Sequence, residues 1–473
     1  MKKIKVGILT MSDGREYLHQ EYEEMNLRYQ ADIAAVLEAT GEFQMIQGQR
    51  AINTNTAARE EAMRLRDQGA QVTIFHYAIW CYPQFTAVAQ NFAPGPYLLF
   101  CNLHPSECGM VGMLAAAGTL DQLNVDYQRL WGSIHEDEVR NKMIAFLRAA
   151  VIPSRLKGMT FGNFGGRPLG MYTAVANVDQ WQREFGIDVE NIEQDDIIRA
   201  GEEVADEKVE AALSWLERTV GSIRYDGKGL TPEKLKLQIR SYYGLRKIIE
   251  SRDLDFIGIK AHGDLTDRYV TMDLAEAFLN DPYDWDGPHE PIVAATESDM
   301  DGALTMQIFK LLTGAPVLFA DVRHYDKEED VWYFSNSGTH ATYFAGGSYR
   351  PEENLKRVTL HPETHYYPAG GASVHHFAKG GEVTLARLAR KNGKYFLTIV
   401  PAEFVEFPED KALALGSLTT PEWPIAFARL KVGADYFLKH FPCNHIHGVY
   451  GNYVEELKIL AELLHMDAVV FEE

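Results

Sequence analysis

Two carboxylates follow apolar runs in the middle of the chain. Glu297 comes directly after "PIVAAT", and Asp321 comes directly after "APVLFA". The segment "DMDGALTMQIFKLL" between them has the pattern of a crossover helix, so both side chains are expected at the carboxyl ends of neighbouring strands, where open α/β sheets bind ligands. Carboxylates held close together repel each other unless a cation neutralises them. The pair therefore predicts a metal site.

A helix cap is the alternative role for acidic residues in this stretch. Asp299 or Asp301 could cap a helix predicted over 302–313 by accepting hydrogen bonds from its first backbone N–H groups. Capping does not explain why both apolar runs end on an acid. We therefore assign capping to Asp299 and Asp301, and metal binding to Glu297 and Asp321.

Histidines in the last third of the chain could complete such a site. "CNHIHGVYGN" contains His445 and His447, which point to one face if the segment is extended, and "NSGTHATYF" contains His340. Further histidines are His365, His375 and His376. A mixed oxygen and imidazole site suits Mn²⁺, Fe²⁺ or Zn²⁺, and an oxygen-rich set with one histidine favours Mn²⁺. For each histidine, the alternative to metal binding is an ordinary structural role.

The elements that must position these residues fall into three predicted domains. Strand-like and helix-like segments alternate over 1–154, which predicts a parallel sheet, and the alternation restarts over 155–313. Residues 200–220 are expected to form one acidic helix. Over 314–473 shorter strands and Gly, Asn and Pro turns predict a mainly β domain. The predicted fold class is α/β, with two parallel-sheet domains followed by a β-rich C-terminal domain.

Composition excludes several classes of function. The chain has 473 residues and a formal net charge of -21, which disfavours nucleic acid and anionic membranes as partners. We see no apolar stretch of about 18 residues, no signal-peptide cleavage pattern and no CxxC pair, so a cytoplasmic protein is expected. "FGNFGGRPLG" lacks the GxGxxG order, and we interpret it as a tight strand-to-helix turn.

Longer motifs resemble those of a known family. "VGILTMSDGR", "YAIWCYPQ", "NSGTHA", "CNHIHGV" and the block from "LTDRYVTMDLAEAF" through "VAATESDMDGALTMQIF" to "FADVRHY" occur in the order seen in L-fucose isomerases, within the L-fucose and L-arabinose isomerase superfamily. The resemblance spans nearly the whole chain. It implies an Mn²⁺-dependent aldose–ketose isomerase with two α/β domains, a β-rich C-terminal domain and a homohexameric assembly.

The resemblance also assigns roles to single residues. It implies that Glu297, Asp321 and His445 bind the metal, and that Trp80 of "WCY" stacks on sugar bound in a neighbouring subunit. The other residues expected to bind substrate are Arg15, Lys260, His262, Trp423 and Asn444.

The chain departs from the fucose isomerase pattern at three places. It has Leu9 where those enzymes have an arginine, and Lys260 where they have a glutamine. His340 lies where L-arabinose isomerases carry a metal-binding histidine. Whether His340 or His447 joins the metal, and which sugar is used, therefore stays open.

The expected reaction is an isomerisation through an ene-diol of an L-fucose-, D-arabinose- or L-arabinose-like sugar. Mn²⁺ would polarise the sugar carbonyl, and Glu297 or Asp321 would move a proton between C2 and C1. Lys260 either contacts the sugar or forms an ordinary salt bridge. The alternatives are another metal-dependent sugar or sugar-phosphate enzyme, such as an epimerase or aldolase, and a non-catalytic sugar-binding protein.

Overall fold

The computed structural model describes residues 2–337 and 339–472, and the chain forms two compact units. The first unit runs to Ser154 and takes in Glu455–Leu463, which is most of helix α17 (Val454–Leu463). The second unit contains Arg155–Val454 and the residues that follow Leu463. In the described part of the chain, no helix is both long and apolar enough to cross a membrane.

The first unit is built on a five-stranded parallel sheet in the order β2-β1-β3-β4-β5. The strands are β1 (Ile4–Met11), β2 (Phe43–Gln47), β3 (Val72–Tyr77), β4 (Tyr97–Cys101) and β5 (Tyr127–Trp131). The helices are α1 (Glu16–Ala39), α2 (Asn55–Asp67), α3 (Gln84–Ala89), α4 (Gly109–Gln122) and α5 (Asp137–Ala150). Every residue of β3 is buried, as expected for an inner parallel strand covered on both faces.

The second unit begins with a four-stranded parallel sheet in the order β12-β9-β6-β7. Its strands are β6 (Thr160–Phe164), β7 (Asp188–Ile192), β9 (Phe256–Ile259) and β12 (Ala294–Ala295). The helices of this part are α6 (Ile152–Leu156), which carries the chain in from the first unit, α7 (Val178–Phe185), α8 (Asp195–Glu202), α9 (Asp206–Thr219), α10 (Pro232–Ser251), α11 (Leu265–Arg268), α12 (Asp273–Asn280) and α13 (Met300–Thr313).

A seven-stranded sheet follows in the order β17-β20-β13-β14-β19-β18-β21. Its strands are β13 (Leu318–Asp326), β14 (Val331–Ser335), β17 (Gly381–Lys391), β18 (Lys394–Phe404), β19 (Ile425–Leu430), β20 (His445–Tyr450) and β21 (Asp467–Val470). Because β17 also pairs with β18, six of these strands close on themselves like a barrel. The short helices here are α14 (Pro351–Leu355), α15 (Glu409–Gly416) and α16 (Ala434–His440).

Two small sheets complete the second unit. β8 (Ser222–Ile223), β15 (Thr359–Pro362) and β16 (Ala372–His375) form one of them, and β10 (Tyr283–Asp284) pairs with β11 (Gly287–Pro288) in the other. Because β8 precedes α10 while β15 follows β14, the first of these sheets ties the parallel-sheet part of the unit to its β-rich part.

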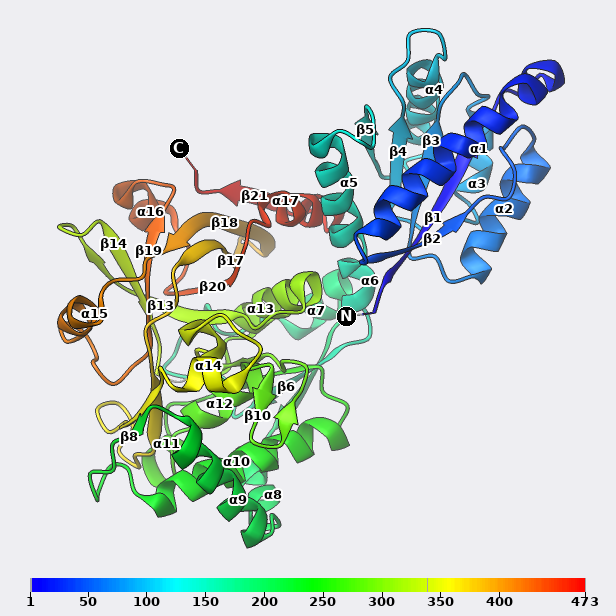
Figure 1. Ribbon diagram of the computed structural model, residues 1–473. Coiled ribbons are helices and arrows are strands. Elements are labelled where there is room, and N and C mark those ends of the chain that lie inside the picture. Colours follow the sequence, from blue (N-terminus) through cyan, green and yellow to red (C-terminus); the bar gives the residue numbers. More distant parts are fainter. Residues whose placement is uncertain (1, 338, 473) are drawn as a thin grey trace. The chain divides into compact units, whose positions relative to one another are not determined.

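Helix α13 connects the two larger sheets of this unit. It packs against β17 and β20, as Figure 1 also shows. Asp299 caps its first turn by accepting a hydrogen bond from the Gly302 N–H at 2.9 Å, and Gly314 ends it in the left-handed conformation. The capping role predicted for Asp299 is confirmed, and the cap fixes where the chain enters the helix. The same role predicted for Asp301 was wrong, because its carboxylate accepts from Arg390 and Tyr395 instead.

The predicted fold class is confirmed, but two further local predictions were wrong. The helix expected over 200–220 is two helices, α8 and α9, separated near Val204. Glu297 and Asp321 do not end neighbouring strands of one sheet. The apolar run before Glu297 forms only the two-residue strand β12 and then turns sharply, and Asp321 lies within β13 of the seven-stranded sheet. Helical and extended periodicity carry no information about such turns, because a turn depends on the φ angles of one or two residues.

Candidate active site

Asp321 and His445 come together because their strands pair in antiparallel register. Asp321 on β13 is the partner of His445 on β20, and Oδ1 of Asp321 lies 3.4 Å from Nε2 of His445. The His445 ring packs against Phe319, with ring centroids 4.7 Å apart, and is almost fully buried. Asn336 Nδ2 donates to the other Asp321 oxygen at 3.2 Å. Strand pairing thus sets the position of both side chains.

Glu297 reaches the same imidazole from a strained turn. Glu297 and Ser298 have φ values of 55° and 45°, in the left-handed region that residues other than glycine rarely adopt. Ser298 Oγ donates to Asn163 Oδ1 at 2.5 Å, which anchors the turn to β6. Glu297 Oε2 lies 3.0 Å from His445 Nε2. Backbone strain of about 1–3 kcal/mol per residue is typical of functional sites.

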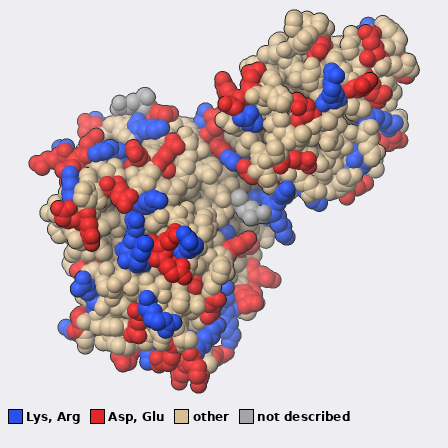
Figure 2. All heavy atoms as spheres, in the orientation of Figure 1, with Lys and Arg blue, Asp and Glu red and all other residues tan. Residues whose placement is uncertain are grey.

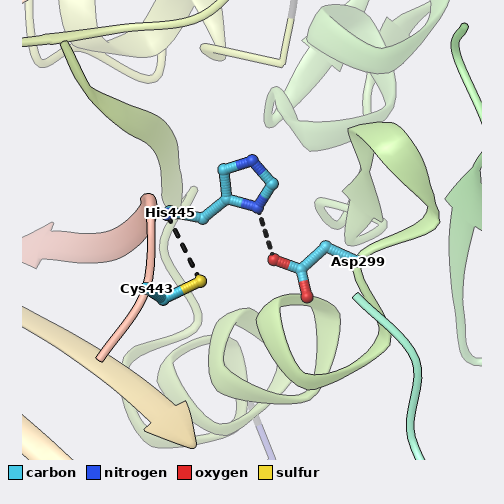
Figure 3. Close-up of side chains that lie close together, drawn as sticks. All are labelled: Asp299, Cys443 and His445. Atoms are coloured by element: carbon cyan, nitrogen blue, oxygen red, sulfur yellow. Dashed lines mark hydrogen bonds and ion pairs between the residues drawn. The ribbon is translucent and has the colours of Figure 1, made fainter. Parts of the chain in front are cut away.

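The other nitrogen of His445 is held by Asp299. Nδ1 lies 2.6 Å from Asp299 Oδ2, and Figure 3 shows the ring directed at this carboxylate. Cys443 lies on the other side, where its sulfur accepts a hydrogen bond from the His445 backbone N–H at 3.5 Å. His445 therefore offers Nε2, rather than Nδ1, toward Glu297 and Asp321.

The charges of this cluster depend on one another. Burial alone would lower the pKa of His445, but its contacts with Asp299, Asp321 and Glu297 raise that pKa well above the ordinary value. Burial would raise the pKa of Glu297, but His262 and His445 lower it to about 2. Without a positive charge at His445 Nε2, two carboxylates would face a lone pair. The cluster needs either a proton or a cation at that point.

A metal ion suits the donor atoms found here. Glu297 and Asp321 lie beside Nε2, yet that nitrogen has no hydrogen-bond partner within residues 2–337 and 339–472. Ligands of one shared cation are arranged in this way, side by side and without hydrogen bonds between them. A possible metal-binding group with all ligand atoms within 4.8 Å is Asp299, Cys443 and His445. Both Asp299 oxygens already accept hydrogen bonds, which favours the Nε2 side.

Two further histidines of the prediction lie elsewhere. His447 is fully buried, with Nε2 3.1 Å from Arg387 Nη1, so this nitrogen accepts from the guanidinium. His340 is also fully buried, with its ring 6.1 Å from that of His376 and edge-on to it. Within the described residues, neither nitrogen of His340 has a hydrogen-bond partner.

His262 belongs to the cluster, and Lys260 precedes it by two residues. His262 Nε2 is 3.2 Å from Glu297 Oε1, and its ring is 5.1 Å from that of Tyr367. Lys260 Nζ forms an ion pair with Asp264 at 3.3 Å. The salt bridge considered as an alternative role for Lys260 is therefore present in the structure.

Asn444 precedes β20, the strand of His445, and Trp423 precedes β19. Trp423 is nearly buried and donates its indole N–H to Glu363. The guanidinium of Arg323, two residues after Asp321, lies 5.1 Å from the Trp423 ring. Asn444, immediately before His445, accepts a backbone hydrogen bond from Val322 at 2.8 Å.

Arg15 and Trp80 belong to the first unit. Arg15 pairs with Asp13 at 2.6 Å and stands at the start of α1, with about half of its side chain exposed at 47%. Trp80 follows β3 and is partly buried.

Sequence reasoning missed the residues that hold the cluster side chains in position. Asp299 was expected to cap a helix, but it also holds His445, and Arg387 was not singled out although it forms an ion pair with Asp299. Asn163 lies in the glycine-rich segment that was interpreted as a turn. The arginine within the apolar run of "VTLARLAR" was the available signal for Arg387.

Comparison with known protein families gives three matches along the chain. The descriptions are L-fucose isomerase, first N-terminal domain, for residues 3–158, second N-terminal domain for residues 250–314, and C-terminal domain for residues 334–472. The third match includes His445, and the second includes Glu297.

Curated relatives match over almost the whole length. The chain is 26% identical to the L-fucose isomerase of Bacteroides thetaiotaomicron, over 98% of this chain and 93% of that protein. It is 24% identical to the L-fucose isomerase of Haemophilus influenzae, over 98% and 92%. A similar match covers 87% of the chain and 82% of the L-fucose isomerase of Streptococcus pneumoniae, at 24% identity.

Proposed function

As a member of the L-fucose isomerase family, this chain is an aldose–ketose isomerase, and we propose that it works with Mn²⁺ held by Glu297, Asp321 and His445. We propose as substrate an open-chain aldose of the L-fucose, D-arabinose or L-arabinose kind. Family membership argues against the epimerase, aldolase and non-catalytic alternatives.

The observation that carries the metal proposal is the surroundings of His445 Nε2. A buried imidazole nitrogen lies 3.0 Å from one carboxylate oxygen and 3.4 Å from another. Two carboxylates with a single imidazole make an oxygen-rich set, which favours Mn²⁺ over softer metals. When bound, the ion supplies a Lewis acid that stabilises negative charge developing on the sugar oxygens.

The carboxylates are the proposed acid and base. In the metal-free protein His262 and His445 lower the pKa of Glu297 to about 2, so at neutral pH this group is a carboxylate, the form that can accept a proton. One of Glu297 and Asp321 removes the proton from C2, and the same or the other carboxylate returns it to C1. His262, which contacts Glu297 Oε1 at 3.2 Å, keeps that oxygen in place during the transfer.

The remaining predicted residues are proposed to bind the sugar. Lys260 and His262 would orient hydroxyl groups, and Trp423 and Asn444 would line the pocket beside the strands of Asp321 and His445. Arg15 is proposed to bind substrate, and Trp80 is proposed to stack on sugar bound in a neighbouring subunit.

A cytoplasmic homohexamer is the proposed form of the enzyme. Support for an oligomer comes from helix α4, where Met110, Val111 and Leu114 expose 47%, 53% and 48% of their surface. On the face drawn in Figure 2, acidic and basic side chains are interspersed over the surface.

A substrate screen with controlled metal tests this proposal. The purified protein is stripped with EDTA, returned to Mn²⁺ or to buffer alone, and incubated with aldopentoses, aldohexoses and 6-deoxy sugars. Ketose should form from at least one aldose with Mn²⁺ and disappear after stripping. Equal turnover in both samples would contradict the metal dependence, and no ketose from any sugar would contradict the proposed substrate class.

A further inference from the structure

Asp299 lies at the centre of a buried polar chain behind the candidate metal site. Its carboxylate is fully buried, and each oxygen accepts two hydrogen bonds. Oδ1 accepts from Gly302 N–H at 2.9 Å and from Arg387 Nη2 at 3.0 Å. Oδ2 accepts from Arg387 Nη1 at 2.5 Å and from His445 Nδ1 at 2.6 Å. This carboxylate has no acceptor position left for a metal ion.

Arg387, on strand β17, is the next residue of this buried hydrogen-bonded group. Its side chain is 1% exposed, and its charge is matched by the fully buried carboxylate of Asp299. Nη2 also donates to the Thr173 carbonyl at 2.9 Å, and Nη1 lies 3.1 Å from His447 Nε2. Four acceptor atoms, from Asp299, Thr173 and His447, fix the guanidinium, which in turn holds the Asp299 carboxylate in place.

The side chains of Asp299 and Arg387 leave no space for a larger residue than glycine at position 302, at the start of α13. A Cβ atom added at Gly302 would lie 2.6 Å from Asp299 Oδ2 and 2.8 Å from Arg387 Nη1. Real Cβ atoms essentially never make contacts this short, so the glycine permits the close approach of Asp299 and Arg387.

The hydrogen bond from His445 to Asp299 decides which ring nitrogen faces the site. A carboxylate paired with a guanidinium accepts hydrogen bonds and donates none, so the hydrogen of this bond belongs to Nδ1. The lone pair available to a cation is then on Nε2, the nitrogen next to Glu297 and Asp321. Outer carboxylates commonly fix metal-binding imidazoles in this way.

We infer that Asp299 and Arg387 are positioning residues, which act through His445 by holding Nδ1 protonated and Nε2 directed at the metal. The inference rests on the proposed Mn²⁺ site, since His445 must be a ligand for its orientation to matter. Asp299 then has a second function besides capping α13, and Arg387 acts on the metal site through Asp299 and His445.

The same helix offers a matched control. Asp301 is also buried, at 3% exposure of its side chain, and pairs with an arginine of the same strand, Arg390, at 3.0 Å. Its other oxygen accepts from Tyr395 at 2.8 Å. Asp301 thus has the same kind of ion pair in the same helical turn, but its partners do not include His445.

Mn²⁺ affinity is the measurement that separates positioning from general stability. Calorimetric titration of the metal-free full-length protein gives Kd for the wild type and for Asp299→Asn, Arg387→Lys, Asp301→Asn and Arg390→Lys. Asp299→Asn should weaken binding about 10- to 100-fold, with Arg387→Lys intermediate, while Asp301→Asn and Arg390→Lys stay within about twofold of wild type. Arg387→Lys keeps the buried charge and serves if Asp299→Asn does not fold.

The outcomes keep this inference apart from the proposed function. If the wild type binds no Mn²⁺, the proposed metal site fails. If the wild type binds Mn²⁺ and Asp299→Asn binds it as tightly as Asp301→Asn does, the metal site stands and the positioning role is overturned. Equal losses in Arg387→Lys and Arg390→Lys would overturn the role of Arg387.

Discussion

Asp321 and His445 stand directly opposite each other on the antiparallel strands β13 and β20, with Asp321 Oδ1 3.4 Å from His445 Nε2. Side chains of directly opposed residues lie on the same face of a sheet, so the register of two strands fixes a carboxylate beside an imidazole. Glu297 reaches the same nitrogen from a turn after a different sheet. Two independent parts of the second unit therefore supply the cluster.

Removing either carboxylate should stop the reaction. Glu297→Gln and Asp321→Asn keep the size of the side chain but remove both the negative charge and the proton acceptor. We expect kcat/KM to fall by about 10²- to 10⁴-fold in each, measured as ketose formation from the sugar identified in the screen. Unchanged thermal unfolding would show that the fold is intact. Near-native turnover in both variants would rule out the proposed acid and base.

Metal binding should release a proton from His445. Because the pKa of His445 is raised well above its ordinary value in the metal-free protein, this imidazole is charged at pH 7 and must lose a proton to bind a cation. Lowering the pH should therefore weaken Mn²⁺ binding, by about tenfold per pH unit. Titration at pH 7 in two buffers of different ionisation enthalpy counts the protons. A binding enthalpy independent of the buffer would contradict the charged state.

Gly302→Ala should destabilise the protein although it removes no polar group. The new methyl group would have to displace Asp299 or Arg387, which lie within 2.8 Å of its position. A matched variant is Gly118→Ala in α4, where a Cβ meets nothing within 4 Å. We expect Gly118→Ala to stabilise the protein by about 0.5–1 kcal/mol in chemical unfolding, and Gly302→Ala to destabilise it. Equal effects would contradict the close packing around Gly302.

Two substitutions separate the possible roles of Lys260. Lys260→Met removes the ammonium group, whereas Asp264→Asn removes only its ion-pair partner at 3.3 Å. If Lys260 binds substrate, Lys260→Met should raise KM by about tenfold, and Asp264→Asn should leave it nearly unchanged, because an exposed salt bridge contributes little by itself. The same small change in both variants would show that Lys260 serves only the salt bridge.

An acidic residue on α4 tests the proposed oligomer. Val111→Glu places a charge among the exposed apolar side chains of this helix, where Val111 is 53% exposed. Light scattering after gel filtration should then show a smaller assembly than the wild type has, because burying an unpaired charge in an interface is costly. An unchanged mass would mean that this helix is not an interface.

The sequence singled out Glu297 and Asp321, although the expected geometry was wrong, because β12 and β13 belong to different sheets and Asp321 lies within β13. The two carboxylates that follow these apolar runs do lie beside one imidazole, His445, while their role as metal ligands stays a prediction. The extended segment at His445 and His447 was also anticipated, and both side chains do contact Phe319. The division into three domains at residues 154 and 313 stays a prediction.

The supporting residues were beyond sequence reasoning for a physical reason. Arg387 and Asp299 are 88 positions apart, and no local pattern records such a pairing. The left-handed turn at Glu297 and Ser298 is set by Asn163 on another strand, so it too depends on tertiary contacts. Where a residue's role depends on partners far away in the sequence, it can be recognised only when the fold is known.

The central claim is that Glu297 and Asp321 move a proton between C2 and C1 of an aldose at a metal-dependent site. The most direct test is to let the Mn²⁺-loaded enzyme act on the identified sugar in D₂O. The Mn²⁺ is then removed, and the sugars are analysed by proton NMR. We predict deuterium at C1 of the ketose and at C2 of the recovered aldose, and none with Glu297→Gln or with the metal-free protein. Deuterium at any other carbon, or equal incorporation by Glu297→Gln, would contradict the account.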